Sequence, residues 1–491
     1  MITKKNSDEY ASDDEWSVAF EHDLLMHYGT CIVQYHGQGE LILRGGKKLG
    51  CKFEVGQMNN GDVIMLCDFS PSIQFLHDIS DSSFEGTTLE GYKVTANKAR
   101  PMNYLPEIPA GCRGSWESIL WHDISVQIVE GDNASRINFG ITNLEYSGTE
   151  GKIVSEGKKF RKINFCILPI NIDEVINLSI IKLKDYDKIM RRLSTLKSID
   201  VTCEIEATLS EDNGIDKLKE IIDNLCYLLS VARGTKIQWI YYNLSNNEGK
   251  LISRTHFSRI TRPYCPLPVI DPSIEGRNET KVFIENAYPI YLKKREAYNL
   301  DHGFIDVYLE GKAEDNFLQT RGVKLAVAME ILKDVFLTTS DSSIKEFIIE
   351  EERFETFFTL ICENIRGTLS GQIDNSALDR LCCRSNQKKL SCLNRASFRQ
   401  AINDLCRSIK FRPENDLSLF IYCRDSLIHK GRFYCETATE KQKAFCKPLK
   451  GPEYEYFFLV DFLDKIILKF FNYSGVYISS QDLKFERKKL I

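Results

Sequence analysis

The chain has 491 residues, of which 43% are hydrophobic and 27% are charged, and its formal net charge is −5. This length predicts two or three domains, and the composition is that of a folded globular protein, which excludes an intrinsically disordered chain. The negative net charge argues against a protein that coats nucleic acid over its whole surface. No stretch approaches the roughly 18 uncharged apolar residues of a membrane span, so we expect no membrane partner.

Residues 1–16 are acidic and contain no apolar run. They predict a disordered tail that is not a signal peptide, and therefore a cytoplasmic protein whose cysteines stay reduced. Four cysteines lie loosely together between positions 382 and 406, but no C-x-x-C pair occurs in the sequence. We therefore predict neither a metal site nor a cofactor. The four cysteines are Cys382, Cys383, Cys392 and Cys406.

Residues 17–183 predict a β-rich, sandwich-like domain with a sensory or regulatory role. Ile137, Phe139 and Ile141 alternate with polar neighbours, which is the period of a half-buried strand. The segment 59–61, Asn-Asn-Gly, is typical of the turn in a β-hairpin. A barrel would give the same pattern. A carbohydrate-binding role would rest on strand pattern and four tryptophans, which are more simply explained as core residues.

Residues 184–275 predict a small α+β segment. Val201, Cys203 and Ile205 alternate as in a strand, and a helical pattern and a second extended stretch follow. Four prolines then fall within ten residues, from Pro263 to Pro272. Proline at this density stops both helices and β-ladders, so we place the main domain boundary here.

Residues 276–491 predict a domain of helices alone. Apolar residues recur at helical spacing along several stretches, which indicates a bundle of about five long helices. The fold class is therefore multidomain α+β, with a β-rich front, a small α+β segment and a helical bundle. The five predicted helices cover approximately 325–336, 354–365, 398–409, 416–430 and 454–473.

Most sequence motifs that mark enzymes are absent: there is no P-loop, no H-E-x-x-H and no G-x-S-x-G. The remaining candidate is the segment 423–431, Cys-Arg-Asp-Ser-Leu-Ile-His-Lys-Gly, at the end of a predicted helix. The surrounding stretch 371–450 holds 16 Lys and Arg against 8 Asp and Glu, a local excess that favours a polyanionic ligand.

Arg424, Asp425 and His429 have the chemistry that RNA cleavage without metal requires. A base must take the proton from the ribose 2′-hydroxyl, an acid must protonate the departing 5′-oxygen, and a cation must stabilise the charge on the phosphorane. His429 titrates near neutral pH and can move both protons. Arg424 offers a permanently charged fork for phosphate oxygens. Asp425 is four residues before His429 and can orient the imidazole.

Arg424 precedes His429 by five residues, about 140° around a helix, so one straight helix does not bring both groups to one atom. Two copies of the helix, meeting in a dimer, would form a composite site. The alternative is a purely structural role, in which the helix ends at Lys430 and Gly431 and a positive histidine stabilises the helix dipole.

The spacing of Arg424 and His429 in a late helix resembles the HEPN ribonucleases. The order of a β-rich front, an α+β segment and this helical domain resembles the ApeA-type anti-phage proteins of bacteria. The resemblance implies a homodimer through the HEPN domain, or a higher oligomer, with two Arg and two His in one cleft. Glu330 resembles the acidic residue that many HEPN domains carry in an early helix, and we predict substrate phosphate contacts at Lys430 and Arg432.

The sequence therefore predicts a metal-independent endoribonuclease of abortive infection. RNA is the expected substrate, tRNA in particular, and the front domains are expected to hold the enzyme inactive until a phage-derived trigger arrives. The alternative is a non-catalytic HEPN module that binds RNA or a partner protein.

Overall fold

The structure is a computed structural model of the chain. It divides the chain into two compact units: a β-rich unit of residues 1–226 and 236–264, and a helical unit of residues 227–235 and 265–491. The division falls between Tyr264 and Cys265, inside the predicted proline-rich boundary. The residues described are 25, 31–69, 79–101, 116–156, 159–172, 176–210, 213–344, 347, 349–369, 371–374, 376–377, 395–439 and 449–490.

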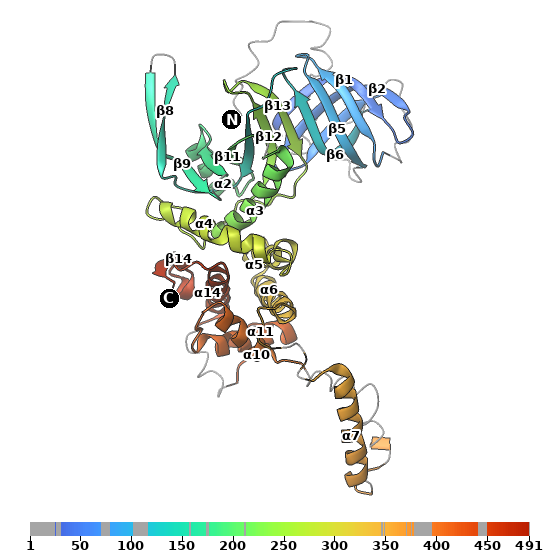
Figure 1. The fold of residues 1–491 in the computed structure, drawn as a ribbon, viewed down its shortest axis with the longest axis vertical. Helices are drawn as coiled ribbons and strands as arrows, with labels where there is room; N and C mark the ends of the chain where they lie inside the picture. Colours follow the sequence, from blue (N-terminus) through green and yellow to red (C-terminus); the bar gives the residue numbers. More distant parts are fainter. Residues whose placement is uncertain are drawn as a thin grey trace. The chain divides into compact units, whose positions relative to one another are not determined.

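Six strands of the β-rich unit form a closed barrel (Figure 1). The strands run in the order β3-β2-β1-β4-β5-β6, and β3 pairs with β6 to close the circle. The predicted hairpin turn at 59–61 joins β2 to β3 and is confirmed. The sandwich-like layout expected from the alternation is thus a barrel here. The strands are β1 (Cys31–Ile42), β2 (Lys48–Met58), β3 (Val63–Asp68), β4 (Ser83–Thr88), β5 (Lys93–Pro101) and β6 (Trp116–Gln127).

Large apolar side chains fill the barrel. Phe53, Phe84 and Trp121 are buried and meet at ring-centroid distances of 5.0 Å and 6.4 Å. Strand β1 passes close to β4 because it carries glycine there: a Cβ at Gly39 would lie 2.4 Å from the ring of Phe84. Trp239, outside the barrel, is also fully buried, so both tryptophans belong to the core.

The same sheet continues beyond the barrel through seven further strands, in the order β6-β13-β12-β7-β11-β10-β9-β8. The predicted strand around Phe139 is confirmed as β7. The strands of the predicted α+β segment, β11 to β13, pair with β7 and β6 and so form no separate layer. The elements are β7 (Arg136–Thr142), β8 (Glu150–Glu156), β9 (Lys159–Asn171), β10 (Asn177–Lys182), α2 (Tyr186–Leu196), β11 (Val201–Thr208), α3 (Ile215–Arg233), β12 (Trp239–Ser245) and β13 (Leu251–Phe257).

The helical unit contains eight α-helices in the part of the chain that the structure describes. The five predicted helices are present. The apolar spacing does not predict helix α4, because Pro289 lies within this helix and its buried face includes the polar residue Thr280. The elements are α4 (Arg277–Lys294), a π-helix η4 (Leu300–Ile305), α5 (Asp306–Lys312), α6 (Leu318–Thr338), α7 (Glu351–Leu369), α10 (Phe398–Ser408), α11 (Asp416–Lys430), α12 (Tyr434–Thr437), α14 (Pro452–Phe470), β14 (Val476–Ser479), a 3-10 helix η6 (Gln481–Leu483) and β15 (Glu486–Lys489).

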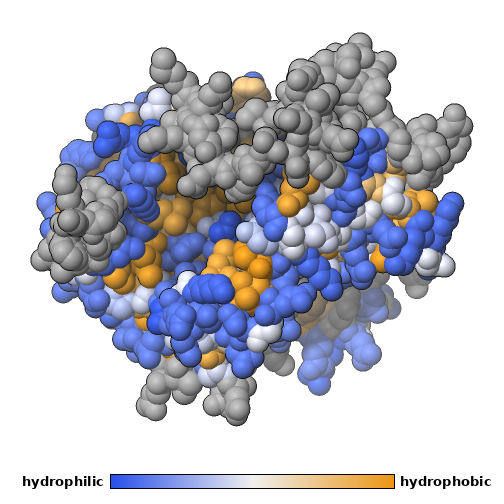
Figure 2. All heavy atoms as spheres, turned by 90° about the horizontal axis from the view of Figure 1, so that it is seen from above, coloured by the Kyte–Doolittle hydropathy of each residue, from blue (hydrophilic) through white to orange (hydrophobic). Residues whose placement is uncertain are grey.

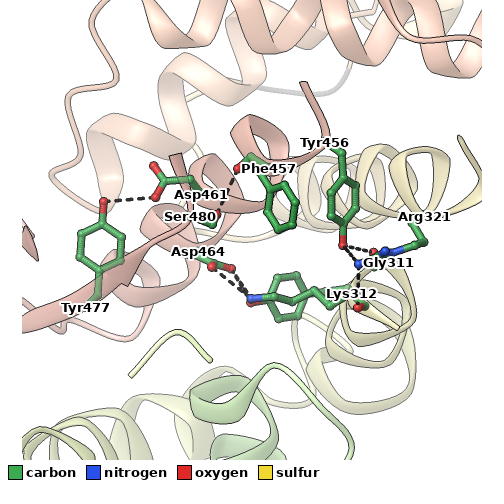
Figure 3. Close-up of polar contacts among 10 residues, drawn as sticks. Gly311, Lys312, Arg321, Tyr456, Phe457, Asp461, Asp464, Tyr477 and Ser480 are labelled. Carbon is green, nitrogen blue, oxygen red and sulfur yellow. Dashed lines mark hydrogen bonds and ion pairs between the residues drawn. The ribbon is translucent and has the colours of Figure 1, made fainter. Parts of the chain in front are cut away.

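A buried ion pair ties α5 to α14 in the core of this unit (Figure 3). Lys312 is fully buried and donates to Asp464 at 2.9 and 3.1 Å, and Tyr308 donates to the same carboxylate at 2.5 Å. Burial raises the pKa of Asp464 and lowers that of Lys312. Asp461 is also buried and pairs with Lys465 at 2.8 Å. Both carboxylates are therefore buried in the core and paired with lysines.

None of the helices in the described ranges has the length and apolarity needed to span a lipid bilayer. The most apolar segment, 454–473, belongs to the core of the helical unit, as the sequence predicted. On the face that Figure 2 presents, hydrophobic patches lie among hydrophilic residues.

One histidine of the β-rich unit is buried without charge. His256 on β13 is 2% exposed, its Nε2 lies 3.5 Å from the hydroxyl of Tyr35, and its Nδ1 has no partner among the described residues. Burial, and then the positive charge of Arg254, lower the pKa of His256 to about 3. The imidazole is therefore neutral at neutral pH, because a proton there would be an unpaired buried charge.

We expect the β-rich unit to lose stability in mild acid because of His256. Between an unfolded pKa of about 6.5 and a folded pKa of about 3, the unfolded chain binds a proton that the folded chain excludes. Stability is therefore complete above pH 6.5 and falls as the pH falls, by about 2 kcal/mol at pH 5. Urea unfolding followed by tryptophan fluorescence measures this, since all four tryptophans lie within this unit's range.

A His256→Gln variant is the matched control, because glutamine does not titrate. Its unfolding free energy should change by about 2 kcal/mol less between pH 7 and pH 5 than that of the wild type. An identical pH dependence in both proteins would contradict the assignment.

Candidate functional site

Helix α11 carries the candidate motif and is fixed to the helical core by its apolar residues. Leu417, Phe420 and Leu427 are buried, and the ring of Phe420 stacks on Phe462 of α14 at 4.5 Å. The helix ends at Gly431, which has a positive φ of 64° and donates its N–H to the carbonyl of Leu427 at 3.0 Å. This confirms the predicted helix end and places His429 in the last turn.

Arg424 lies on the side of α11 that faces α6 and α10. Its side chain is 14% exposed, and its Nη1 donates to Asp425 at 2.6 Å. Its Nη2 forms an ion pair with Oε1 of Glu330 on α6, and its Cζ lies 4.7 Å from the ring centroid of Phe398 on α10. Three helices thus hold one guanidinium in a defined place.

Glu330 is the acidic partner on α6, and its side chain is 20% exposed. Its second oxygen accepts from Lys333 at 3.0 Å, and Lys333 also pairs with Asp334 at 2.6 Å. Burial acts to lower the pKa of Lys333, but these two carboxylates outweigh it and the pKa is raised. The structure therefore places Glu330 in a charged network with Arg424 and not on an open solvent face.

The polar atoms around Arg424 are incompletely satisfied. Its Nε is buried and has no hydrogen-bond partner among the described residues. Oε1 of Glu330 contacts Nη2 as an ion pair, but the geometry is not that of a hydrogen bond. A buried donor without an acceptor is unusual in a folded protein.

His429 is exposed and has neither a hydrogen-bond nor an ion-pair partner in the described part of the chain. Asp425 is 48% exposed and turns its carboxylate to Arg424, so the predicted contact from Asp425 to His429 is not formed in this chain. Lys430 and Arg432 are exposed as well. The structure thus brings Arg424, Asp425 and Glu330 together and leaves His429 accessible beyond them.

The turn after α11 is fixed by a residue that the sequence analysis missed. Glu455 of α14 is fully buried and accepts the backbone N–H groups of Tyr434 and Cys435, each at 2.8 Å. Burial raises the pKa of Glu455, and these two donors act against the shift. A single Glu in an apolar helix is weak as a signal, because the backbone groups that require it are not visible in the sequence.

Phe398 and Lys333 were also missed. Phe398 was assigned only to an apolar stripe, and its ring faces both Arg424 and Lys333, the latter at 6.0 Å. Among the described residues, no three His, Cys, Asp or Glu side chains are grouped to hold a metal ion. Of the four loosely grouped cysteines, Cys406 is buried, and Cys382, Cys383 and Cys392 lie outside the described residues.

No protein-family model, no curated protein and no solved structure matches this chain.

Removing the carboxylate of Glu330 should destabilise the helical unit more than removing that of Asp425. Glu330→Gln leaves a mostly buried guanidinium without its inter-helix partner, at a cost of about 1 to 3 kcal/mol. Asp425→Asn, at a half-exposed position, should cost less than about 1 kcal/mol. Urea unfolding followed by far-ultraviolet circular dichroism compares the two. Equal, small effects would show that the ion pair between α6 and α11 contributes little.

Proposed function

We propose that the helical unit is a metal-independent, HEPN-type endoribonuclease in which His429 transfers protons and Arg424 stabilises the phosphorane. The observation that carries this proposal is the contrast between the two side chains on α11. The guanidinium of Arg424 on α11 contacts side chains of α6 and α10, whereas the imidazole of His429 is exposed and has no hydrogen-bond or ion-pair partner among the described residues. A substrate can reach His429 without any rearrangement of the core.

In the proposed reaction His429 removes the proton from the ribose 2′-hydroxyl, and the 2′-oxygen attacks the adjacent phosphorus. The bond from phosphorus to the 5′-oxygen breaks, and a protonated imidazole supplies the proton to that oxygen. Arg424 donates to the equatorial oxygens, where negative charge accumulates. Because each chain contributes these groups from different sides of α11, we propose a homodimer in which two copies of this helix form the cleft.

The carboxylates around Arg424 support a restrained enzyme. Glu330 and Asp425 both pair with the guanidinium, so a phosphate oxygen must share or replace one of them. Under this proposal Asp425 can turn from Arg424 to His429 when substrate binds. An unrestrained ribonuclease would damage its host, and the resemblance to ApeA-type proteins suggests anti-phage defence, a phage-derived trigger and tRNA as the substrate. Lys430 and Arg432 are proposed to contact substrate phosphates.

A non-catalytic module that binds RNA or a partner protein is the second candidate. It is favoured by the same contacts of Arg424, because a guanidinium held between α6, α10 and α11 also serves as a structural clamp. In that case His429 would only stabilise the end of α11. The two candidates differ in whether the protein cleaves RNA and whether that cleavage requires His429.

Replacing His429 by Ala should abolish RNA cleavage while leaving the fold intact, because the side chain is exposed. Arg424→Ala should lower the cleavage rate about a hundredfold to a thousandfold, since an electrostatic donor of this kind contributes about 3 to 4 kcal/mol. Both are measured on purified protein with RNA in excess EDTA, where the wild type is expected to remain active. Arg424→Lys, which keeps the charge but not the fork, covers the case in which Arg424→Ala fails to fold.

Arg407→Ala on α10 and His122→Ala on β6 are matched controls, because both side chains are solvent-accessible and lie outside the candidate site. Full cleavage by the His429→Ala and Arg424 variants would show that neither residue is catalytic, and RNA binding without cleavage by the wild type would support the non-catalytic module. Cleavage that is lost in EDTA and restored by magnesium would overturn the mechanism.

A further inference from the structure

A pocket with several charged side chains lies on the helical unit, at the opposite end of α11 from His429. Its volume is about 260 Å³, and it is lined by the loop before α11, by α14 and by the β14–β15 hairpin. His429 lies 13 residues after Asp416, which begins α11 and lines this pocket, or roughly 20 Å along a straight helix. The pocket is therefore separate from the group around Arg424.

Three cationic side chains at this pocket are available to bind an anion. Arg412, Lys488 and Lys489 are exposed, and none of them has a hydrogen-bond or ion-pair partner among the described residues. Lys488 stands directly opposite Tyr477 in the β14–β15 ladder, so the two side chains share one face of the hairpin. Phe411 adds an apolar wall beside Arg412.

Lys465 pairs with two carboxylates, Asp416 in the pocket lining and the buried Asp461 outside it. Its Nζ lies 2.8 Å from Asp461 and 3.9 Å from Asp416, and Tyr477 donates to Asp461 at 3.5 Å (Figure 3). Burial raises the pKa of Asp416, and Lys465 acts against this shift. The pocket lining holds four cations, Arg412, Lys465, Lys488 and Lys489, against two carboxylates, Glu414 and Asp416. An anion placed at the rim therefore meets a positive field.

We propose that this pocket binds the phosphate group of a nucleotide, with Arg412 and Lys488 as its ligands and the wall formed by Phe411 beside the sugar. Guanidinium and ammonium groups are the side chains that proteins use for phosphate oxygens. The pocket is slightly smaller than the 300 to 1,000 Å³ typical of drug-sized ligands, so it suits one nucleotide unit. The nucleotide is either part of an RNA strand that extends along the helical unit or a free effector.

The test measures binding, so it does not depend on cleavage. A short, labelled 2′-O-methyl RNA, which lacks the hydroxyl needed for cleavage, is titrated against the full chain by fluorescence anisotropy. In an Arg412→Gln, Lys488→Gln double variant the Kd should rise about tenfold. The slope of log affinity against log salt should also decrease by about 1.4, for two lost contacts to a single strand. Lys484→Gln, an exposed lysine of the same C-terminal segment outside the pocket, should bind as the wild type does.

Competition by unlabelled nucleotide and by inorganic phosphate distinguishes the two sources of the phosphate. Weak competition by both indicates an RNA strand, whereas strong competition by the free nucleotide indicates an effector. The inference is overturned if the double variant binds RNA and nucleotide as tightly as the wild type, or if the wild type binds neither. A His429→Ala chain should bind RNA with the same dependence on Arg412 and Lys488, so a failure of the proposed cleavage would leave this result intact.

Discussion

The arrangement of the candidate site depends on one interaction, the ion pair between Arg424 of α11 and Glu330 of α6. A guanidinium with little solvent contact needs a carboxylate, and this one is met from a second helix while Phe398 of α10 covers its face. Together with the buried apolar residues of α11, the pair fixes this helix in the helical unit with His429 exposed in its last turn.

Basic side chains lie near both ends of helix α11. Its C-terminal end presents His429, Lys430 and the anchored turn with Arg432, and its N-terminal end lies beside a pocket with free cations. Under the two proposals made above, both ends bind phosphate, although the formal net charge of the chain is −5. An acidic chain with two local basic regions can bind RNA at defined places and not over its whole surface.

The sequence predicted the order of the fold because alternation and helical spacing report burial directly: β7 lies where Phe139 indicated, and α6 covers the predicted helix 325–336. It could not predict the closure of the barrel, since the pairing of β3 with β6 joins residues far apart in the chain. At the site, the spacing of Arg424 and His429 and the position of Glu330 were visible. The inter-helix ion pair, the ring of Phe398 and the anchoring role of Glu455 depend on packing between helices that no local pattern encodes.

The central claim is that two copies of α11 together form one catalytic cleft, and mixing of complementary variants tests it most directly. An Arg424→Ala chain and a His429→Ala chain, each inactive alone, are unfolded together, refolded as a mixture and assayed for RNA cleavage in EDTA. If each cut takes Arg from one protomer and His from the other, random pairing restores up to about a quarter of the wild-type activity. If the mixture contains mixed dimers and remains as inactive as its components, the composite site is contradicted.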